Sequence, residues 1–174
     1  SLDDLMHGLG KSLIFAVLIA VIGVANGASV QGGAEGVGKA TTRAVDRALS
    51  MAGAGAADID LVAVHGESRS DLDAIEARGL SECLGDRAAE VPVLALSAHV
   101  GSVEAAVGPM GAALVLQSMT TGRVPGALNR DQPMAEYHGP TASASSDIDA
   151  KLGLVSLTTR EGVSSALVFR KLDN

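Results

Sequence analysis

Two histidines stand where a parallel sheet would place reactive groups. His65 ends the short apolar run 59–65 and is followed by Gly66, and His99 comes shortly after a second apolar run, 92–96. Because ligands of open parallel sheets bind beyond the carboxyl ends of strands, His65 is the best-placed polar side chain for chemistry. It could act as a general base or an oxyanion donor, or be a hydrogen-bonded structural residue. If the two strands are neighbours, both histidines would face one crevice.

The other candidate residues are better explained by structural roles than by chemistry. Cys83 falls on the apolar side of a predicted helix, as expected of a small buried hydrophobe. Asp73 and Glu76 have capping-box spacing, in which the first side chain accepts from first-turn amides and the second reaches back to the cap amide. No spacing of histidines, cysteines and carboxylates forms a metal signature, and the glycine-rich segment 23–38 contains no phosphate-binding loop. We therefore expect no metal and no cofactor.

Strands and helices alternate along the chain and must position these groups. Apolar residues recur at helical spacing over 34–51, with Gly53 placed to end the helix. A second helix is predicted over 73–84. A third, over 103–119, is apolar on nearly every side, which is typical of a helix buried between layers, and its Pro109 requires a kink or a later start. The predicted strands are 59–65, 92–96, 152–157 and 163–169, the last two forming a hairpin with Gly162 in the left-handed turn position.

The apolar segment 13–25 admits two interpretations. It is rich in β-branched residues, which favours a buried parallel strand, whereas a preceding lysine and following small residues also fit a secretory leader over 13–28. We prefer the strand, because an amphipathic helix follows it almost at once. The element order is then β-α-β-α-β-α-β-β, an α/β fold with a mainly parallel five-stranded sheet and helices on both faces. One domain would span 1–174, with 1–11 as a leader segment and 130–150 as a polar surface loop.

Composition excludes several classes of function. The chain has 174 residues, a net charge of −7 and only 2% aromatic residues, so it lacks the clustered cations and stacking platforms that nucleic-acid binding needs. The apolar run 13–25 is shorter than the roughly 20 residues of a spanning helix, so no membrane partner is expected. Cys83 is the single cysteine, which cannot form an internal disulfide and favours a reducing, cytoplasmic location.

Further along the chain, several motifs occur in a recognisable order. His65-Gly66 is followed by Asp73-x-x-Glu76 and by Gly85-Asp86, and the later motifs are Val91-Pro-Val, Glu104-Ala-Ala-x-Gly108, Val124-Pro-Gly-Ala-Leu-Asn129 and Ala166-Leu-Val-Phe169. The set resembles the C-terminal half of the β-ketoacyl-acyl carrier protein synthases of the thiolase superfamily. In that family the histidine of a His-Gly-Thr-Gly-Thr motif is followed by Gly-Asp-x-x-Glu. The resemblance covers residues from about 15 to 169, and it implies the same element order and a family histidine at His65.

The departures from the family pattern concern its chemistry. Ser97 stands where the family has a lysine, and Ser102 where it has a second histidine, from which His99 is offset by three residues. Residues 67–69 replace Thr-Gly-Thr, and 158–161 replace a glycine-phenylalanine gate. The family's nucleophilic cysteine belongs to an N-terminal half for which the chain leaves no room. Condensation needs a thiolate and imidazole donors, and a serine hydroxyl is a weaker partner for the developing charge.

The resemblance therefore implies a ketosynthase-like half-domain of fatty acid or polyketide synthesis that is noncatalytic alone and acts as a structural or interaction module. His65 would be vestigial, with Asp73 and Glu76 serving the fold. The alternative is the C-terminal subunit of a split condensing enzyme, an acyltransferase whose partner chain supplies the cysteine. A small-molecule binder using the crevice beside His65 is a third hypothesis. The expected partners are a second copy or another ketosynthase-like chain, covering helix 103–119, and an acyl carrier protein.

Overall fold

The computed structural model describes residues 17, 33–101, 103–128, 134–136, 139–140, 144–159 and 162–172. Its helices are α2 (Gly33–Ala52), α3 (Ser70–Leu84), α4 (Ser97–Val100) and α5 (Val107–Thr121), with 3-10 turns at η1 (Ala56–Asp58), η2 (Gly85–Ala89) and η3 (Glu104–Ala106). Its strands are β1 (Leu61–Val64), β2 (Val93–Ala95), β3 (Arg123–Val124), β4 (Ser146–Asp147), β5 (Leu152–Thr158) and β6 (Ser164–Arg170). Within the strand predicted over 13–25, Val17 is the one described residue, and it is helical, so the prediction is wrong at that residue. The rest of 13–25 and the segment 1–11 lie outside the described residues.

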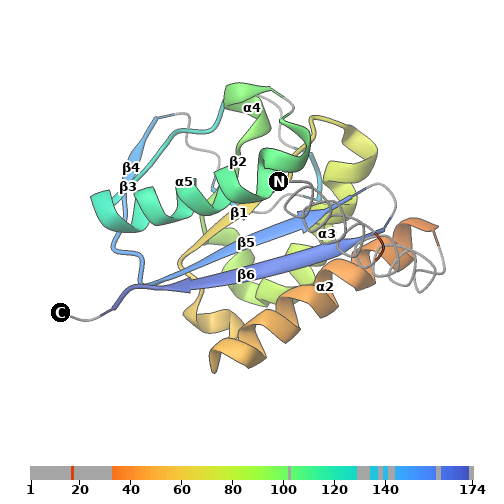
Figure 1. Ribbon diagram of the computed structural model, residues 1–174, viewed down its shortest axis with the longest axis horizontal. Coiled ribbons are helices and arrows are strands. Elements are labelled where there is room, and N and C mark those ends of the chain that lie inside the picture. Colours follow the sequence, from red (N-terminus) through yellow and green to blue (C-terminus); the bar gives the residue numbers. More distant parts are fainter. Residues whose placement is uncertain are drawn as a thin grey trace, which may run out of the picture.

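The main sheet has four described strands in the order β2-β1-β5-β6 (Figure 1). β1 pairs in parallel with both β2 and β5, and β6 pairs antiparallel with β5. This confirms the predicted mainly parallel sheet with a final antiparallel hairpin. Since β1, β2 and β5 run in one direction, the residues that follow these three strands meet at the same edge of the sheet.

Both faces of the sheet are covered by helices, as predicted (Figure 1). Val62 and Val64 of β1 pack in one core cluster with residues of α2 and α3, whereas Leu61 and Ala63 pack in the other with residues of α5. Side chains alternate along a strand, so an all-apolar strand is expected where both faces are buried. The helical residues of the two clusters are Val45, Leu49, Leu80 and Leu84 on the first face and Val115 and Met119 on the second.

Helix α2 confirms the helix predicted over 34–51 and ends at the predicted glycine. Gly53 has a positive φ of 61°. Its backbone N–H donates to Ser50 O at 3.2 Å, and the N–H of Ala54 donates to Leu49 O at 3.0 Å. This pair of bonds is the Schellman arrangement, which satisfies carbonyl groups that the helix itself cannot pair.

Helix α3 begins three residues earlier than predicted, and the capping box at Asp73 and Glu76 is wrong. The cap residue is Arg69, which makes no side-chain capping bond. The backbone N–H of Asp73 already donates to Arg69 O at 2.8 Å, so it needs no cap. Asp71 and Asp73 instead lie in the first turn, where negative charge suits the helix dipole. The carboxyl group of Glu76 leaves the helix to bind the turn after β1.

Helix α5 starts at Val107, which places Pro109 in the first turn, where its missing N–H has no helical partner to lose. The prediction that this helix is buried on nearly every side does not hold in the single chain. Its inner face packs on β1 and β5, but Leu116 is 46% exposed. The other exposed residues of its outer face include Ala113, Gln117 and Thr120.

The C-terminal part of the fold also follows the prediction. Gly162 has a positive φ of 80° in the hairpin turn between β5 and β6, as expected for the left-handed position. Within the predicted loop 130–150, the described residues are irregular apart from β4, which pairs antiparallel with β3. None of the described helices combines the length and the apolar content needed to cross a membrane.

Candidate functional site

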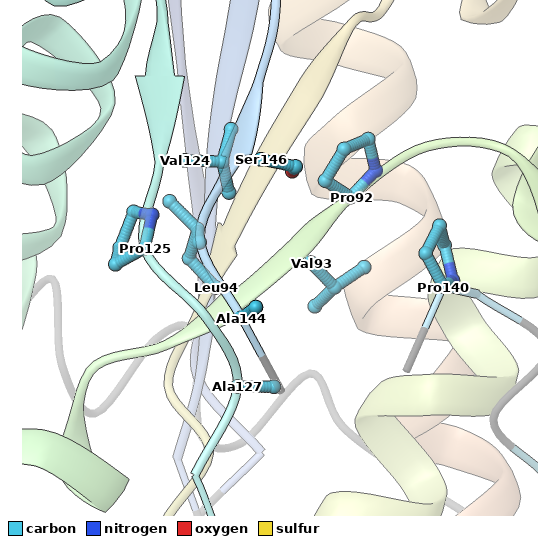
Figure 2. Close-up of a pocket in the computed structure, with 9 residues that line it drawn as sticks. All are labelled: Pro92, Val93, Leu94, Val124, Pro125, Ala127, Pro140, Ala144 and Ser146. Carbon is cyan, nitrogen blue, oxygen red and sulfur yellow. The ribbon is translucent and has the colours of Figure 1, made fainter. Parts of the chain in front are cut away.

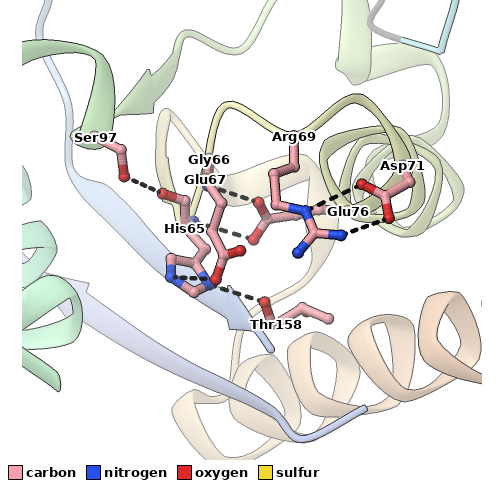
Figure 3. A network of polar contacts seen from close by, with 8 residues as sticks. All are labelled: His65, Gly66, Glu67, Arg69, Asp71, Glu76, Ser97 and Thr158. Carbon is pink, nitrogen blue, oxygen red and sulfur yellow. Dashed lines mark hydrogen bonds and ion pairs between the residues drawn. The ribbon is translucent and has the colours of Figure 1, made fainter. Parts of the chain in front are cut away.

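His65 follows β1 directly, and both nitrogens of its ring contact acceptors of the same chain (Figure 3). Nδ1 lies 2.9 Å from the carbonyl oxygen of Thr158 at the end of β5. Nε2 lies 3.2 Å from Oε1 of Glu67. A carbonyl oxygen only accepts, so Nδ1 donates to Thr158, and an ionised carboxylate also only accepts. Nδ1 therefore makes a hydrogen bond to β5, and Nε2 lies within ion-pair distance of Glu67.

Glu76 holds the backbone of the turn that carries His65. Its Oε1 accepts from the backbone N–H of His65 and its Oε2 from that of Gly66, each at 3.1 Å. From the other side, the hydroxyl of Ser97 at the start of α4 donates to the carbonyl oxygen of His65 at 3.0 Å. The turn is thus anchored from α3 and α4 at once (Figure 3).

Burial outweighs hydrogen bonding in setting the charge of Glu76. Its side chain is 5% exposed, and burial raises its pKa from 4.5 to about 7, against the opposing effect of the two backbone N–H groups and of His65. Burial also raises the pKa of the nearby Asp73, against hydrogen bonds from the backbone of Glu67 and Arg69. Near neutral pH, Glu76 is therefore protonated in a substantial fraction of molecules.

The turn after β1 is sharp and brings Glu67 back over the ring. Gly66 has a positive φ of 55°, and a Cβ at this position would lie 2.8 Å from the Cβ of Ala95 in β2, so the approach requires glycine. Ser68 is the one described non-glycine residue with positive φ, at 61°. Arg69 pairs with Asp71 through two contacts of 3.3 and 2.9 Å. Glu67 thus lies between two left-handed residues, beside an arginine that is already paired.

Three hydroxyl groups tie the hairpin to α2 beside the acceptor of His65. Thr41 donates to the carbonyl oxygen of Val37 at 3.2 Å, and its oxygen lies 2.7 Å from Oγ1 of Thr158. Oγ of Ser164 lies 3.2 Å from Oγ1 of Thr158. Since the proton of Thr41 is given to Val37, Thr158 donates to Thr41 and Ser164 donates to Thr158. Thr158 therefore binds α2 through its hydroxyl and His65 through its carbonyl.

The structure does not bring His65 and His99 together, although β1 and β2 are neighbours. His99 lies on α4 with an exposed side chain. Its Nε2 is 3.0 Å from Gly126 O, and its Nδ1 is 3.4 Å from Ala95 O. Within the described residues, no contact joins the two rings. The hypothesis of one crevice shared by both histidines is not supported.

The thiol of Cys83 is unsuited to nucleophilic chemistry. Cys83 is half-buried on α3, and its Sγ lies 3.7 Å from the carbonyl oxygen of Thr42. Burial raises its pKa to about 11, so little thiolate forms near neutral pH. Of the two positions at which the family places its lysine and second histidine, Ser97 spends its hydroxyl on the backbone of His65. Ser102 lies outside the described residues.

Elsewhere in the described part of the chain, the surface offers little for chemistry. A small hollow lies beside β2 (Figure 2), and Ser146 is the one polar side chain among its described lining residues. The described residues contain no group of three or more histidine, cysteine and acidic side chains placed to hold a metal ion. The residues lining the hollow are Pro92, Val93, Leu94, Val124, Pro125, Ala127, Pro140, Ala144 and Ser146.

The relatives of this chain include polyketide synthases. The chain is 37% identical over 99 residues to the phenolphthiocerol synthesis polyketide synthase type I Pks15/1 of Mycobacterium bovis, which covers 55% of this chain and 5% of that protein. It is 32% identical over 125 residues to the pikromycin polyketide synthase component PikAIII of Streptomyces venezuelae, covering 70% of this chain and 7% of that one. The chain thus spans a small part of the length of these relatives.

Solved ketosynthases share the fold. The ishigamide ketosynthase/chain length factor aligns with a TM-score of 0.69 at 18% identity, covering 81% of this chain and 34% of that one. A type II polyketide ketosynthase, solved with its acyl carrier protein and bound to a hexaketide, aligns with a TM-score of 0.70 at 20% identity, covering 76% and 33%. The family model described as the C-terminal domain of β-ketoacyl synthase matches residues 16–131. The sequence match and the thiolase-like α/β fold agree, and the chain belongs to the family of β-ketoacyl synthase C-terminal domains.

Proposed function

We propose that this chain, taken as one domain over 1–174, is a noncatalytic structural or interaction module of polyketide or fatty acid synthesis. The observation that carries the proposal is the state of His65. Its Nδ1 donates to Thr158 O, and its Nε2 contacts the carboxylate of Glu67. An imidazole stabilises a developing oxyanion by directing a ring N–H at it, and here Nδ1 is committed to Thr158 O while a carboxylate oxygen lies 3.2 Å from Nε2.

The surroundings of His65 support the same proposal. The thiol of Cys83 is half-buried with its pKa raised to about 11, and it lies on α3. Ser97, at the position of the family's lysine, donates to the backbone of His65. Loss of a single oxyanion donor typically lowers the rate about 100-fold to 1000-fold, so the combined changes would leave little condensation. What the site retains is its set of anchoring hydrogen bonds.

The proposal is tested by an activity assay on the purified chain. Incubated with malonyl-loaded and acyl-loaded carrier protein, it is expected to give no condensation product and no malonyl decarboxylation above the rate without protein. A ketosynthase with its own cysteine serves as the positive control. Turnover that the chain supports alone, and that His65→Ala abolishes, would contradict the proposal.

The same assay separates the proposal from a split condensing enzyme. In that alternative, a partner chain carrying the nucleophilic cysteine would co-purify with this one. The condensing activity of the complex would then fall in the His65→Ala variant. Under our proposal such a partner keeps its rate when His65 is replaced, because His65 does not take part in the reaction.

We propose a second ketosynthase-like half, either another copy or a related chain, as the structural partner. The outer face of α5 carries Leu116, which is 46% exposed, and the neighbouring strand β6 exposes 53% of Leu167. Leu157 and Phe169, on the α5 side of the hairpin, are also only partly buried. Apolar surface of this kind favours association. A cytoplasmic location and an acyl carrier protein as a further partner complete the proposal.

A dimer is therefore expected in light scattering at micromolar concentration. Leu116→Glu should shift the chain to the monomer, because a charge on the outer face of α5 would be buried in the interface. Met51→Glu is the matched control: Met51 is 82% exposed at the end of α2, on the opposite side of the sheet. A compact wild-type monomer, or equal effects of the two substitutions, would refute this arrangement.

A further inference from the structure

We propose that Glu67 is an internal ligand of His65: its carboxylate occupies an anion-binding position at Nε2 and masks a site that would otherwise bind a small carboxylate. The pair is partly accessible, with 14% of the His65 side chain and 31% of the Glu67 side chain exposed. The inference deepens the proposed function, because it explains why Nε2 of the retained histidine faces a carboxylate of the same chain instead of a substrate. It rests on the contacts of these two residues with their neighbours.

The two ring nitrogens of His65 have partners of different kinds. Nδ1 is held by a backbone carbonyl at the end of β5, which is part of the sheet. The backbone of the turn is anchored by Glu76 and Ser97, and neither of them contacts Nε2. The ring is therefore positioned without any contribution from Glu67. Removing the carboxylate of Glu67 should leave Nε2 of an oriented ring facing partly open space.

Glu67 itself is held mainly through its backbone. Its N–H donates to the carboxyl group of Asp73, and the next residue, Ser68, has a left-handed backbone. Within the described residues, its carboxylate pairs with His65, whereas Arg69 is engaged by Asp71. The side chain can therefore leave the ring by rotation, without breaking the turn.

The ligand chemistry follows from what already occupies the site. A carboxylate oxygen lies 3.2 Å from Nε2, within ion-pair distance, so the masked position suits a small carboxylate ion. A tethered carboxylate competes at a high effective concentration, which hides the site from dilute external anions. Asp73 and Glu76 lie nearby, but Glu76 is largely protonated below about pH 7 and then adds little repulsion.

The test is an acetate titration of the 15N-labelled full chain, followed through the backbone amide signal of Gly66. We would work near pH 6 and keep ionic strength constant with chloride. Glu67→Gln should show saturable shifts with half-saturation on the order of tens of millimolar, as expected for one charge-assisted hydrogen bond. The wild-type chain should need at least about ten times more acetate.

Matched variants distinguish the site from a general effect of charge. Asp86→Asn removes one negative charge from the exposed turn η2 and leaves the pair of His65 and Glu67 intact, so it should behave as the wild type. The double variant His65→Gln with Glu67→Gln should lose the binding. Glu67→Ser provides a second way to unmask the ring if the glutamine variant does not fold.

If folded Glu67→Gln and Glu67→Ser chains bind acetate no better than the wild type and Asp86→Asn, the inference is wrong. The outcome is independent of the proposed function, which is tested by condensation in the wild-type chain. A catalytically silent chain with no unmasked acetate site would leave the proposed function intact and remove this inference alone.

Discussion

Replacing Gly153 by alanine is expected to destabilise the chain severely. Gly153 lies in β5 and faces α5, and an added Cβ would overlap Cγ1 of Val115 and lie 3.0 Å from Sδ of Met119. Val115 is fully buried and β-branched, so it cannot rotate away, and α5 would have to move off the sheet. Overpacking typically costs about 1–3 kcal/mol and occasionally more, and we expect a loss at or above the upper end. The free energy of unfolding from chemical denaturation measures it.

Gly111→Ala is the matched control for this prediction, because Gly111 faces the same interface from α5. Its added Cβ would lie 3.5 Å from Cγ1 of Val155 and 3.7 Å from the Cβ of Ala63, which are ordinary contacts. Alanine is also preferred over glycine within a helix by up to about 1 kcal/mol. Stability should therefore stay unchanged or rise. A Gly153→Ala variant as stable as Gly111→Ala would show that α5 and β5 do not pack as described.

The second large effect that we expect is a fall in the free energy of unfolding as pH rises, caused by Glu76. Burial raises the pKa of Glu76 in the folded chain to about 7, against 4.5 when it is exposed. Between these values the folded state keeps a proton that the unfolded state has lost, so the free energy of unfolding decreases as pH rises through this window. The loss in the free energy of unfolding is complete, at about 3 kcal/mol, above about pH 7, and it is absent below about pH 4.5.

Glu76→Gln should remove most of this slope, because a neutral amide does not titrate. The glutamine will lower stability at acidic pH, since it offers one acceptor for the two backbone N–H groups of His65 and Gly66. Asp73→Asn is the control for the neighbouring carboxyl group. Burial raises the pKa of Asp73 too, so it contributes to the slope with the same sign. Unfolding curves at several pH values give the result, and an unchanged slope in Glu76→Gln would contradict the assigned burial.

The sequence predicted most of the fold because its signals are local. The all-apolar run of β1, the helical periodicity of α2 and the glycines at positions 53 and 162 depend on neighbouring residues. The start of α3 was predicted wrongly for the same reason. Asp73 and Glu76 fit a local capping pattern, but the carboxyl group of Glu76 binds His65 and Gly66, 11 and 10 residues away in the chain. A long-range contact therefore replaced the local one.

Within the candidate site, the sequence predicted His65 but not the residues that contact it. His65 was singled out from its place at a strand end, whereas Thr158 and Glu67 were noticed only as replacements of family residues. Thr158 carried no other signal, because it contacts His65 across 93 residues of chain. Glu67 is close in sequence, but whether its side chain points to the ring depends on the left-handed backbone at Ser68. Serine seldom adopts that conformation, so the residue types did not indicate it.

The sequence by itself determined the order of strands and helices, the position of His65 at the end of β1 and the resemblance to a condensing-enzyme half. These follow from side-chain periodicity, turn residues and motif spacing, which are properties of short segments. Only the tertiary structure decided what His65 can do. By pairing β1 with β5 it brings Thr158 to Nδ1, and by the turn after β1 it brings Glu67 to Nε2. The hydrogen-bonding capacity of an imidazole depends on which acceptors its surroundings place against it, and folding sets those surroundings.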